Sequence, residues 1–228
     1  MKKIILIFTI LMFVTASPAY AHKLISHDDS HKDIDNALRI PDHKISWAIY
    51  ENLGANEARF YSFDGKNGDL FYASVIVPKI EELETYSPTM ILVNPDKIEN
   101  KKGFSESQNN IQKFLYEGNF PSKEFYEPFG QVTYWERQEI NSILPIDGEY
   151  FIIVLDEKNQ KGKYSLAIGT VEDFSNENMF LVLPQSWWDT KIFVNDYISI
   201  GILFFVVIFS IFTIAFGVER KIKNKSSS

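Results

Sequence analysis

A run of 22 residues without a charged side chain, from Tyr197 to Val218, constrains this chain more than any other feature of its sequence. Apolar residues lie on every side of the helix that this run would form, and such a helix finds its solvent only in lipid. At ~1.5 Å per residue it is long enough to cross a bilayer with modest tilt. Residues 197–218 are therefore predicted to be a transmembrane helix. Residues 175–196 are predicted to be a juxtamembrane linker, in which Trp187 and Trp188 suit the aromatic belt of the membrane interface.

The two ends of the chain predict its orientation. Residues 1–21 are typical of a secretory signal peptide, because a lysine pair precedes a short apolar core and Ala19-Tyr20-Ala21 offers a small-x-small cleavage site. Basic residues outnumber acidic ones after the apolar run, so the positive-inside rule makes residues 219–228 a cytoplasmic tail. The sequence thus predicts a type I single-pass protein of the cell membrane, with residues 22–196 outside the cytoplasm.

Composition limits the fold and the function of the part predicted to be outside. The chain has no cysteine, which excludes disulfide scaffolds, cysteine-ligated metals and thiol nucleophiles. Seventeen basic and 29 acidic residues lie between His22 and Asp196, a net charge of −12 that argues against a nucleic-acid partner. Sequence motifs of hydrolases, zinc proteases and nucleotide-binding proteins are absent. We therefore expect no enzymatic activity.

Alternation of apolar and polar residues predicts seven β-strands separated by turn signals. Residues 64–69 and 156–162 are predicted to be hairpin loops, because their glycine and asparagine residues accept positive φ. The oxygen ligands of Asp64, Asn67 and Asp69 would also suit calcium, but their spacing does not match an EF-hand and favours a turn. The predicted strands are residues 45–50, 58–64, 70–78, 89–95, 131–139, 149–156 and 163–169.

A doubled pattern is the strongest internal regularity. Its two copies are Gly148-x-Tyr150-x-Ile152-x-Val154 and Gly162-x-Tyr164-x-Leu166-x-Ile168. In each copy the alternate residues share one face of a strand, so we expect a hairpin with that face on the core. Seven short strands with one buried face predict an all-β fold, an antiparallel two-sheet sandwich over residues 45–174.

The order of motifs within this region resembles a known family. The segments that carry the resemblance are Ala58-Arg59-Phe60-Tyr61-Ser62-Phe63-Asp64, Gly68-Asp69-Leu70-Phe71, residues 87–93 and the two Gly-x-Tyr strands. Together they resemble the bacterial pre-peptidase C-terminal (PPC-like) β-sandwich over roughly residues 45–170. The resemblance implies a jelly-roll-like module that assists binding or secretion, and such modules usually accompany a secreted enzyme, which this chain lacks. We therefore expect a membrane-anchored binding or accessory module outside the cytoplasm.

A long insert between the fourth and fifth predicted strands, residues 96–130, offers a candidate binding surface. Residues 107–117 have the apolar spacing of a short helix, and aromatic residues are crowded after it. One interpretation is a lid that closes the sandwich with its aromatic residues inside. The other is a recognition surface for a protein partner or an envelope glycan. Its candidate residues are Phe120, Phe125, Tyr126, Phe129 and Trp135.

Residues 22–44 form an acidic, histidine-rich segment with little apolar content. We expect it to be a flexible, solvated lead-in to the sandwich. The alternative is a metal site in which His22, His27 and His31 bind Cu(II) or Zn(II). If residue 22 were the mature N-terminus, its amine and imidazole would together chelate copper, and this layout resembles the periplasmic subunit of copper membrane monooxygenases. Packing of this segment onto the sandwich would favour the metal site, and no other cofactor is expected.

The predicted orientation is testable by protease protection. Protease added to intact cells or spheroplasts is expected to digest the extracytoplasmic part and to spare a tag placed after Ser228, because the basic tail is predicted to be cytoplasmic. An immunoblot for the tag measures this, with lysed cells as the control in which the tag is also degraded. Loss of the tag from sealed cells would contradict the orientation.

Overall fold

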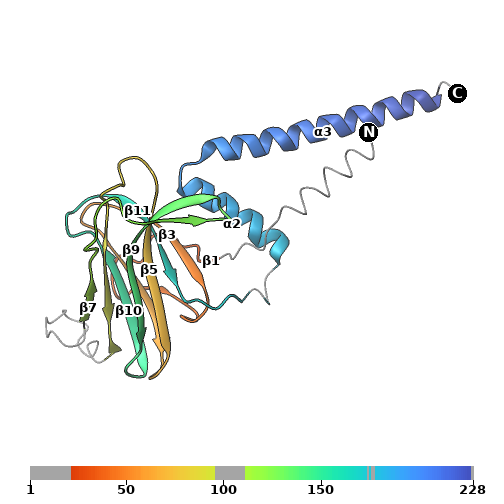
Figure 1. The fold of residues 1–228 in the computed structure, drawn as a ribbon. Helices are drawn as coiled ribbons and strands as arrows, with labels where there is room; N and C mark the ends of the chain where they lie inside the picture. Colours follow the sequence, from red (N-terminus) through yellow and green to blue (C-terminus); the bar gives the residue numbers. More distant parts are fainter. Residues whose placement is uncertain (1–21, 96–110, 174, 176–177, 227–228) are drawn as a thin grey trace. The chain divides into compact units, whose positions relative to one another are not determined.

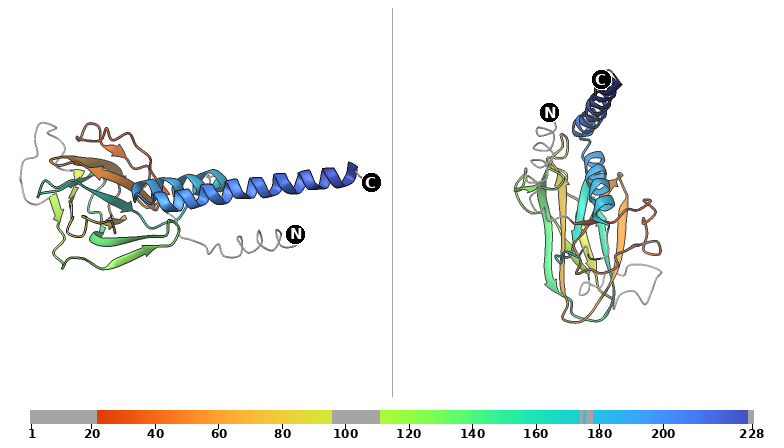
Figure 2. Two further views of the ribbon diagram at one scale, coloured as in Figure 1. Left: turned by 90° about the horizontal axis from the view of Figure 1, so that it is seen from above. Right: turned by 90° about the vertical axis from the view of Figure 1, so that its right-hand side faces the viewer.

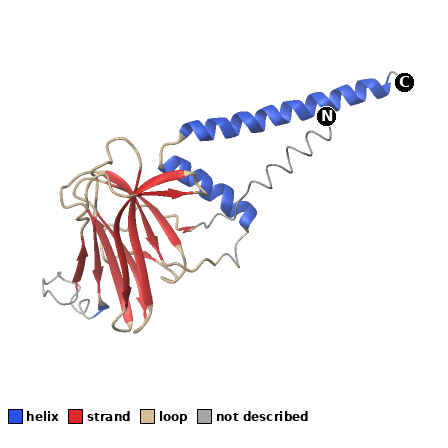
Figure 3. Cartoon of the chain, in the orientation of Figure 1, coloured by secondary structure: helices blue, strands red, loops and turns tan. Residues whose placement is uncertain are grey.

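The chain consists of two compact units. The computed structural model describes residues 22–95, 111–173, 175 and 178–226 (Figure 1). Of the elements that the structure describes, the β-strands belong to the first unit, up to Glu177, and helices α2 and α3 belong to the second, from Asn178 onward (Figure 3). The predicted signal peptide lies outside the described residues.

Two β-sheets face each other and form a sandwich. The first sheet contains, in spatial order, β1 (Lys23–Leu24), β3 (Trp47–Leu53), β11 (Gly162–Ile168), β5 (Leu70–Pro78), β9 (Val132–Ile143) and β8 (Glu124–Glu127). The second contains β2 (Leu38–Arg39), β4 (Ala58–Gly65), β10 (Gly148–Leu155), β6 (Thr89–Val93) and β7 (Ile111–Phe114). The predicted two-sheet sandwich is confirmed. Because β1 and β2 pair in parallel with β3 and β4, however, both sheets are mixed rather than purely antiparallel.

The two predicted hairpins are wrong, because the strands that they would join lie in opposite sheets. Strand β10 pairs with β4 and β6, whereas β11 pairs with β3 and β5. The loop after β4 likewise leads to β5 in the other sheet. A strand has the same inward-facing pattern whether its neighbour in the chain lies beside it or across the core. Both loops therefore pass from sheet to sheet.

The glycine that begins each copy of the doubled pattern is required by a close approach. A Cβ atom on Gly148 would lie 2.7 Å from the Pro95 ring, and one on Gly162 would lie 2.5 Å from the Tyr86 ring. Gly148 also has a φ of 146°, which favours glycine. The repeated glycine thus marks two crowded strand starts rather than the two ends of one hairpin.

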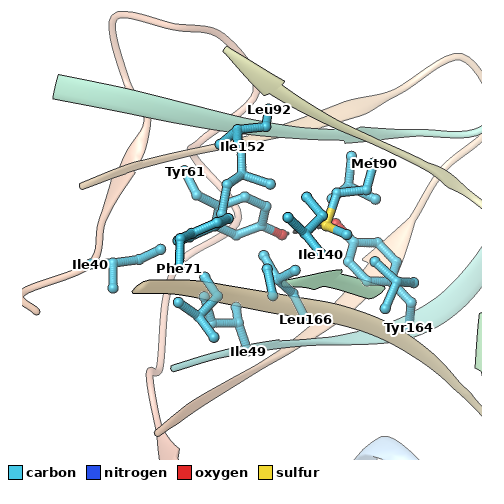
Figure 4. Packing of buried hydrophobic residues seen from close by; sticks show 14 of the residues in the cluster. Ile40, Ile49, Tyr61, Phe71, Met90, Leu92, Ile140, Ile152, Tyr164 and Leu166 are labelled. Atoms are coloured by element: carbon cyan, nitrogen blue, oxygen red, sulfur yellow. Dashed lines mark hydrogen bonds between the residues drawn. The ribbon is translucent and has the colours of Figure 1, made fainter. Parts of the chain in front are cut away.

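The inward faces of both sheets meet in one hydrophobic core. Figure 4 shows Tyr61, Leu92 and Ile152 of the second sheet opposite Ile49 and Leu166 of the first. The predicted core residues Ile152, Val154, Tyr164, Leu166 and Ile168 are all buried, which confirms the predicted inward faces of β10 and β11. Ser165, on the opposite face of β11, is also buried, so this central strand is covered on both sides.

The helix predicted over residues 107–117 is wrong in the part that the structure describes. Residues 107–110 lie outside the described residues, and Ile111–Phe114 forms β7, paired antiparallel with β6. The edge of β6 offers unpaired backbone groups, and satisfying them outweighs a weak local preference for helix.

The second unit is a pair of helices, α2 (Met179–Phe193) and α3 (Tyr197–Ser226). Helix α2 thus occupies most of the predicted linker. Asp196 caps the start of α3, because its Oδ1 accepts a hydrogen bond of 3.1 Å from the Ser199 amide. Its Oδ2 lies 2.8 Å from the ammonium group of Lys191, which ties the end of α2 to that cap.

Helix α3 contains the predicted membrane span. Residues Tyr197–Gly217 are long and apolar enough to cross a membrane, in close agreement with the predicted 197–218. Trp188 of α2 packs edge-on against Phe204, with ring centroids 6.0 Å apart. Among the described residues this is the one helix with such a length and composition.

The strand assignment of β11 predicts unequal costs for two leucine truncations. Leu166→Ala is expected to lower the free energy of unfolding by ~2–5 kcal/mol, because it opens a cavity between the sheets. Leu70→Ala is the matched control, since Leu70 lies on a strand but is 70% exposed, and a surface truncation typically changes stability by about 0.5 kcal/mol or less. Denaturant unfolding of the detergent-solubilised chain measures both, and similar small effects would contradict the placement of Leu166.

Candidate functional site

The N-terminal segment, residues 22–40, lies along the side of the sandwich formed by β3 and β4. Figure 2 shows it in red and orange on one side of the sheets. Strand β1 pairs with β3 of the first sheet and β2 with β4 of the second. Between them the carbonyl of His31 accepts a hydrogen bond of 3.0 Å from the Phe60 amide. The expectation of a flexible lead-in is therefore wrong: backbone pairing to two exposed edges holds a segment with few apolar residues.

A charged residue lies on the inward face of β3. Glu51 alternates with Ile49 and Leu53, and all three side chains are buried. Arg59 occupies an equivalent position on β4, in phase with Tyr61 and buried like it. Two opposite charges thus face the interior, one from β3 in the first sheet and one from β4 in the second.

Polar groups from two segments, the N-terminal segment and β4, surround the carboxylate of Glu51, which has no exposed surface. Its Oε1 accepts a hydrogen bond of 2.8 Å from the Tyr61 hydroxyl, and Nε2 of His31 lies 2.7 Å from the same oxygen. Nε2 of His27 lies 3.4 Å from Oε1 and 3.1 Å from the carbonyl of Tyr50. Arg59 Nε donates to Oε2 at 3.2 Å. The buried charge is therefore fully partnered, as a carboxylate in a protein interior must be.

The charge of Arg59 is balanced by a second carboxylate. Its Nη2 donates to Glu57 at 3.0 Å. Burial lowers the pKa of Arg59, but the hydrogen bond to Glu57 and the charge of Glu51 outweigh that effect and raise the pKa overall. A hydrogen bond from Lys32 lowers the pKa of Glu57 to about 2, with further contributions from the Gly54 amide and Arg59. Glu57 therefore remains ionised beside Arg59.

Two tyrosines extend the polar cluster into the core. The hydroxyls of Tyr61 and Tyr164 lie 2.8 Å apart. Burial raises the pKa of both hydroxyls well above the ordinary value, so both remain neutral. The cluster thus runs from the N-terminal segment through Glu51 to β11 in the middle of the first sheet.

The structure brings together two of the three histidines predicted as metal ligands. Ligand atoms of His27, His31 and Glu51 lie within 4.8 Å of one another. His22 is not part of this group; its Nδ1 lies 2.6 Å from the hydroxyl of Ser46, and burial lowers its pKa. Two of the three residues considered for calcium form ion pairs, Asp64 with Arg39 and Asp69 with Lys44.

Sequence reasoning missed Glu51 and Arg59. The predicted strand ended at Tyr50, one residue before Glu51, whereas β3 continues to Leu53. A signal was present: in both strands a charged residue continues the period-2 series of inward-facing residues. Opposite charges in phase with the core residues of consecutive strands indicate a buried ion pair across the two sheets.

The five residues predicted for partner binding divide between surface and core. Phe120, Phe125 and Tyr126 are 38%, 36% and 57% exposed, and Phe129 is partly buried. Trp135 is 3% exposed, so its inclusion in a binding surface is wrong; it packs into the core from β9. Alternation along a strand cannot separate these cases, because β8 lies at an edge of the sheet whereas β9 is covered.

Arg137 of β9 contacts several residues around Phe120. Its guanidinium carbon lies 5.1 Å from the ring centroid of Phe120 and 5.4 Å from that of Tyr116. Its Nε donates to the carbonyl of Tyr86 at 2.8 Å, and another nitrogen donates to the hydroxyl of Ser122. Burial lowers the pKa of Arg137 to about 10. These contacts attach the chain around Phe120 to the sandwich.

Comparison with known proteins gives similarities to solved structures. No family model matches the chain, and no curated protein matches its sequence. A pre-peptidase C-terminal domain of a Bacillus anthracis collagenase is 18% identical over 57% of this chain and 91% of its own, with a TM-score of 0.35. PliG of Aeromonas hydrophila, a periplasmic inhibitor of g-type lysozyme, is 13% identical over 65% of this chain and 98% of its own, with a TM-score of 0.35. PliG of Salmonella Typhimurium is 14% identical over 64% of this chain and 94% of its own, with a TM-score of 0.28.

The buried pair of Glu51 and Arg59 predicts a non-additive double substitution. Arg59→Met is expected to cost about 3–5 kcal/mol of unfolding free energy, because it leaves a buried carboxylate without its cationic partner. Adding Glu51→Gln removes that charge, so the double variant should be more stable than the sum of the two single effects predicts. Denaturant unfolding of the unchanged protein, the two single variants and the double variant measures the coupling energy. Additive effects would contradict a direct interaction between Glu51 and Arg59.

Proposed function

We propose that the chain is a membrane-anchored binding module that presents its sandwich to a protein partner outside the cytoplasm. Helix α3 supplies an anchor of suitable length, and the predicted signal peptide and basic tail give the orientation. The sequence contains none of the motifs of hydrolases, zinc proteases or nucleotide-binding proteins, and a binding module needs no catalytic residues in its sandwich.

The surface that carries this proposal is the aromatic edge, defined as strand β8 with Phe120, Phe125 and Tyr126. Strand β8 pairs with β9 on one side, and no described strand pairs with its other side. Such an edge offers main-chain donors and acceptors to an added strand, while exposed aromatic side chains provide the contact area typical of binding hot spots.

The occupant that fits the aromatic edge is an extended, basic segment of another protein. An extended peptide segment can pair its own backbone donors and acceptors with the unpaired backbone groups along β8. A glycan does not offer such a regular row of amide donors and carbonyl acceptors. The net charge of −12 between His22 and Asp196 favours a basic segment by electrostatic steering. Exposed ion pairs border the edge, Lys79 with Glu124 at 2.6 Å and Lys123 with Glu136 at 3.1 Å, and resemble the polar rim of an interface.

Site-specific photo-crosslinking in membranes tests the proposed surface. A photo-reactive amino acid at Tyr126 is expected to crosslink one protein, and mass spectrometry should locate the crosslink in an extended basic segment of it. The same amino acid at Ile143 is the matched control, because Ile143 is also exposed and lies at the far end of β9.

Phe125→Ala provides the second arm of this experiment. It is expected to reduce the crosslink from position 126 at least about 10-fold, since losing a hot-spot aromatic residue costs roughly 2 kcal/mol or more of binding. Equal crosslinking from positions 126 and 143, or no effect of Phe125→Ala, would contradict the proposal. Capture of glycan fragments instead of a protein would also contradict it.

A further inference from the structure

Three potential metal ligands converge where the N-terminal segment crosses the edge of β3. They are a ring nitrogen from each of His27 and His31 and a carboxylate oxygen of Glu51. The Oε1 atom of Glu51 lies 3.4 Å from Nε2 of His27 and 2.7 Å from Nε2 of His31. Two ligands of a tetrahedral zinc ion are about 3.3 Å apart when each bond is about 2.0–2.1 Å. The distance from Glu51 to His27 already fits this value, and the distance from Glu51 to His31 would have to lengthen by about 0.6 Å.

The contacts of His31 leave Nε2 as its nitrogen at the cluster. Its Nδ1 is buried and has no hydrogen-bond partner among the described residues. No described group therefore holds a proton on Nδ1, and the tautomer of His31 depends on what faces Nε2, which is Oε1 of Glu51.

The groups around the cluster are those that support a metal-binding histidine. Nδ1 of His27 accepts a hydrogen bond of 3.3 Å from the Asp29 amide and lies 3.2 Å from Oδ1 of the same residue, and these contacts hold the ring with Nε2 directed at Glu51. Arg59 binds Oε2 of Glu51 and leaves Oε1 toward the histidines. Glu57 offsets the positive charge of Arg59 and so reduces its repulsion of a cation.

We propose that His27, His31 and Glu51 bind one Zn²⁺ ion. Two imidazole nitrogens and one carboxylate oxygen are a ligand set that zinc accepts, and zinc tolerates an irregular arrangement because its filled d shell imposes no geometry. Two ligands lie on the N-terminal segment and the third on β3, so the ion fastens that segment to the edge of the first sheet. This site is separate from the aromatic edge, and its test does not depend on a partner.

The test uses the full chain in mild detergent, stripped of metal with a chelator and titrated with ZnCl₂ by calorimetry. One Zn²⁺ is expected per chain, and ZnCl₂ should raise the temperature of unfolding because the ion binds only the folded site. His27→Ala is the principal variant, since His27 lies at the outer side of the cluster. It is expected to weaken zinc binding at least about 10-fold, the loss typical of removing even a supporting group of a metal site.

His22→Ala is the matched control, because it removes a histidine of the same segment that contacts Ser46 instead. It should leave zinc affinity unchanged, and circular dichroism should confirm that both variants are folded. Co²⁺ in place of zinc reports the site directly, since its visible absorption should change in Glu51→Gln and not in His22→Ala. No saturable zinc binding, equal affinity in all variants, or loss of binding in His22→Ala alone would each overturn the proposal.

Discussion

A carboxylate buried on the inward face of β3 is the constraint around which the N-terminal half of the sandwich is arranged. An ionised group loses its hydration in the interior and is tolerated only with partners. Glu51 obtains them from Tyr61 and Arg59 on the opposite sheet and from His31 on the N-terminal segment. These contacts join β3 of the first sheet to β4 of the second, so the charge that is costly to bury also specifies how these two strands face each other.

The two edges of the first sheet differ from each other. Strand β1 of the chain itself pairs with β3 at one end, whereas no described strand covers β8 at the other. Unpaired edges invite association with other chains, and proteins generally cover or disrupt them. One edge here ends in the two-residue strand β1, and the other carries exposed aromatic side chains. The proposed metal site and the proposed partner surface therefore occupy opposite ends of the same sheet.

The sequence predicted properties that depend on neighbouring residues and missed those that depend on distant ones. Alternation located seven of the eleven described strands and the inward faces of β10 and β11, because burial of every second residue is a property of one strand. It did not show that β10 and β11 lie in different sheets. Similarly, the spacing of Ile111 and Phe114 suits a helix, and only the free edge of β6 explains their place in β7.

By itself the sequence determined a two-sheet β fold, one helix of membrane-spanning length, a histidine-rich segment and an aromatic-rich insert. Only the tertiary structure decided that His27 and His31 meet Glu51 while His22 contacts Ser46. It also decided that Tyr126 is exposed whereas Trp135 belongs to the core. The physical reason is that local sequence sets the face on which a side chain lies. What lies against that face is decided by backbone pairing and burial between segments far apart in the chain.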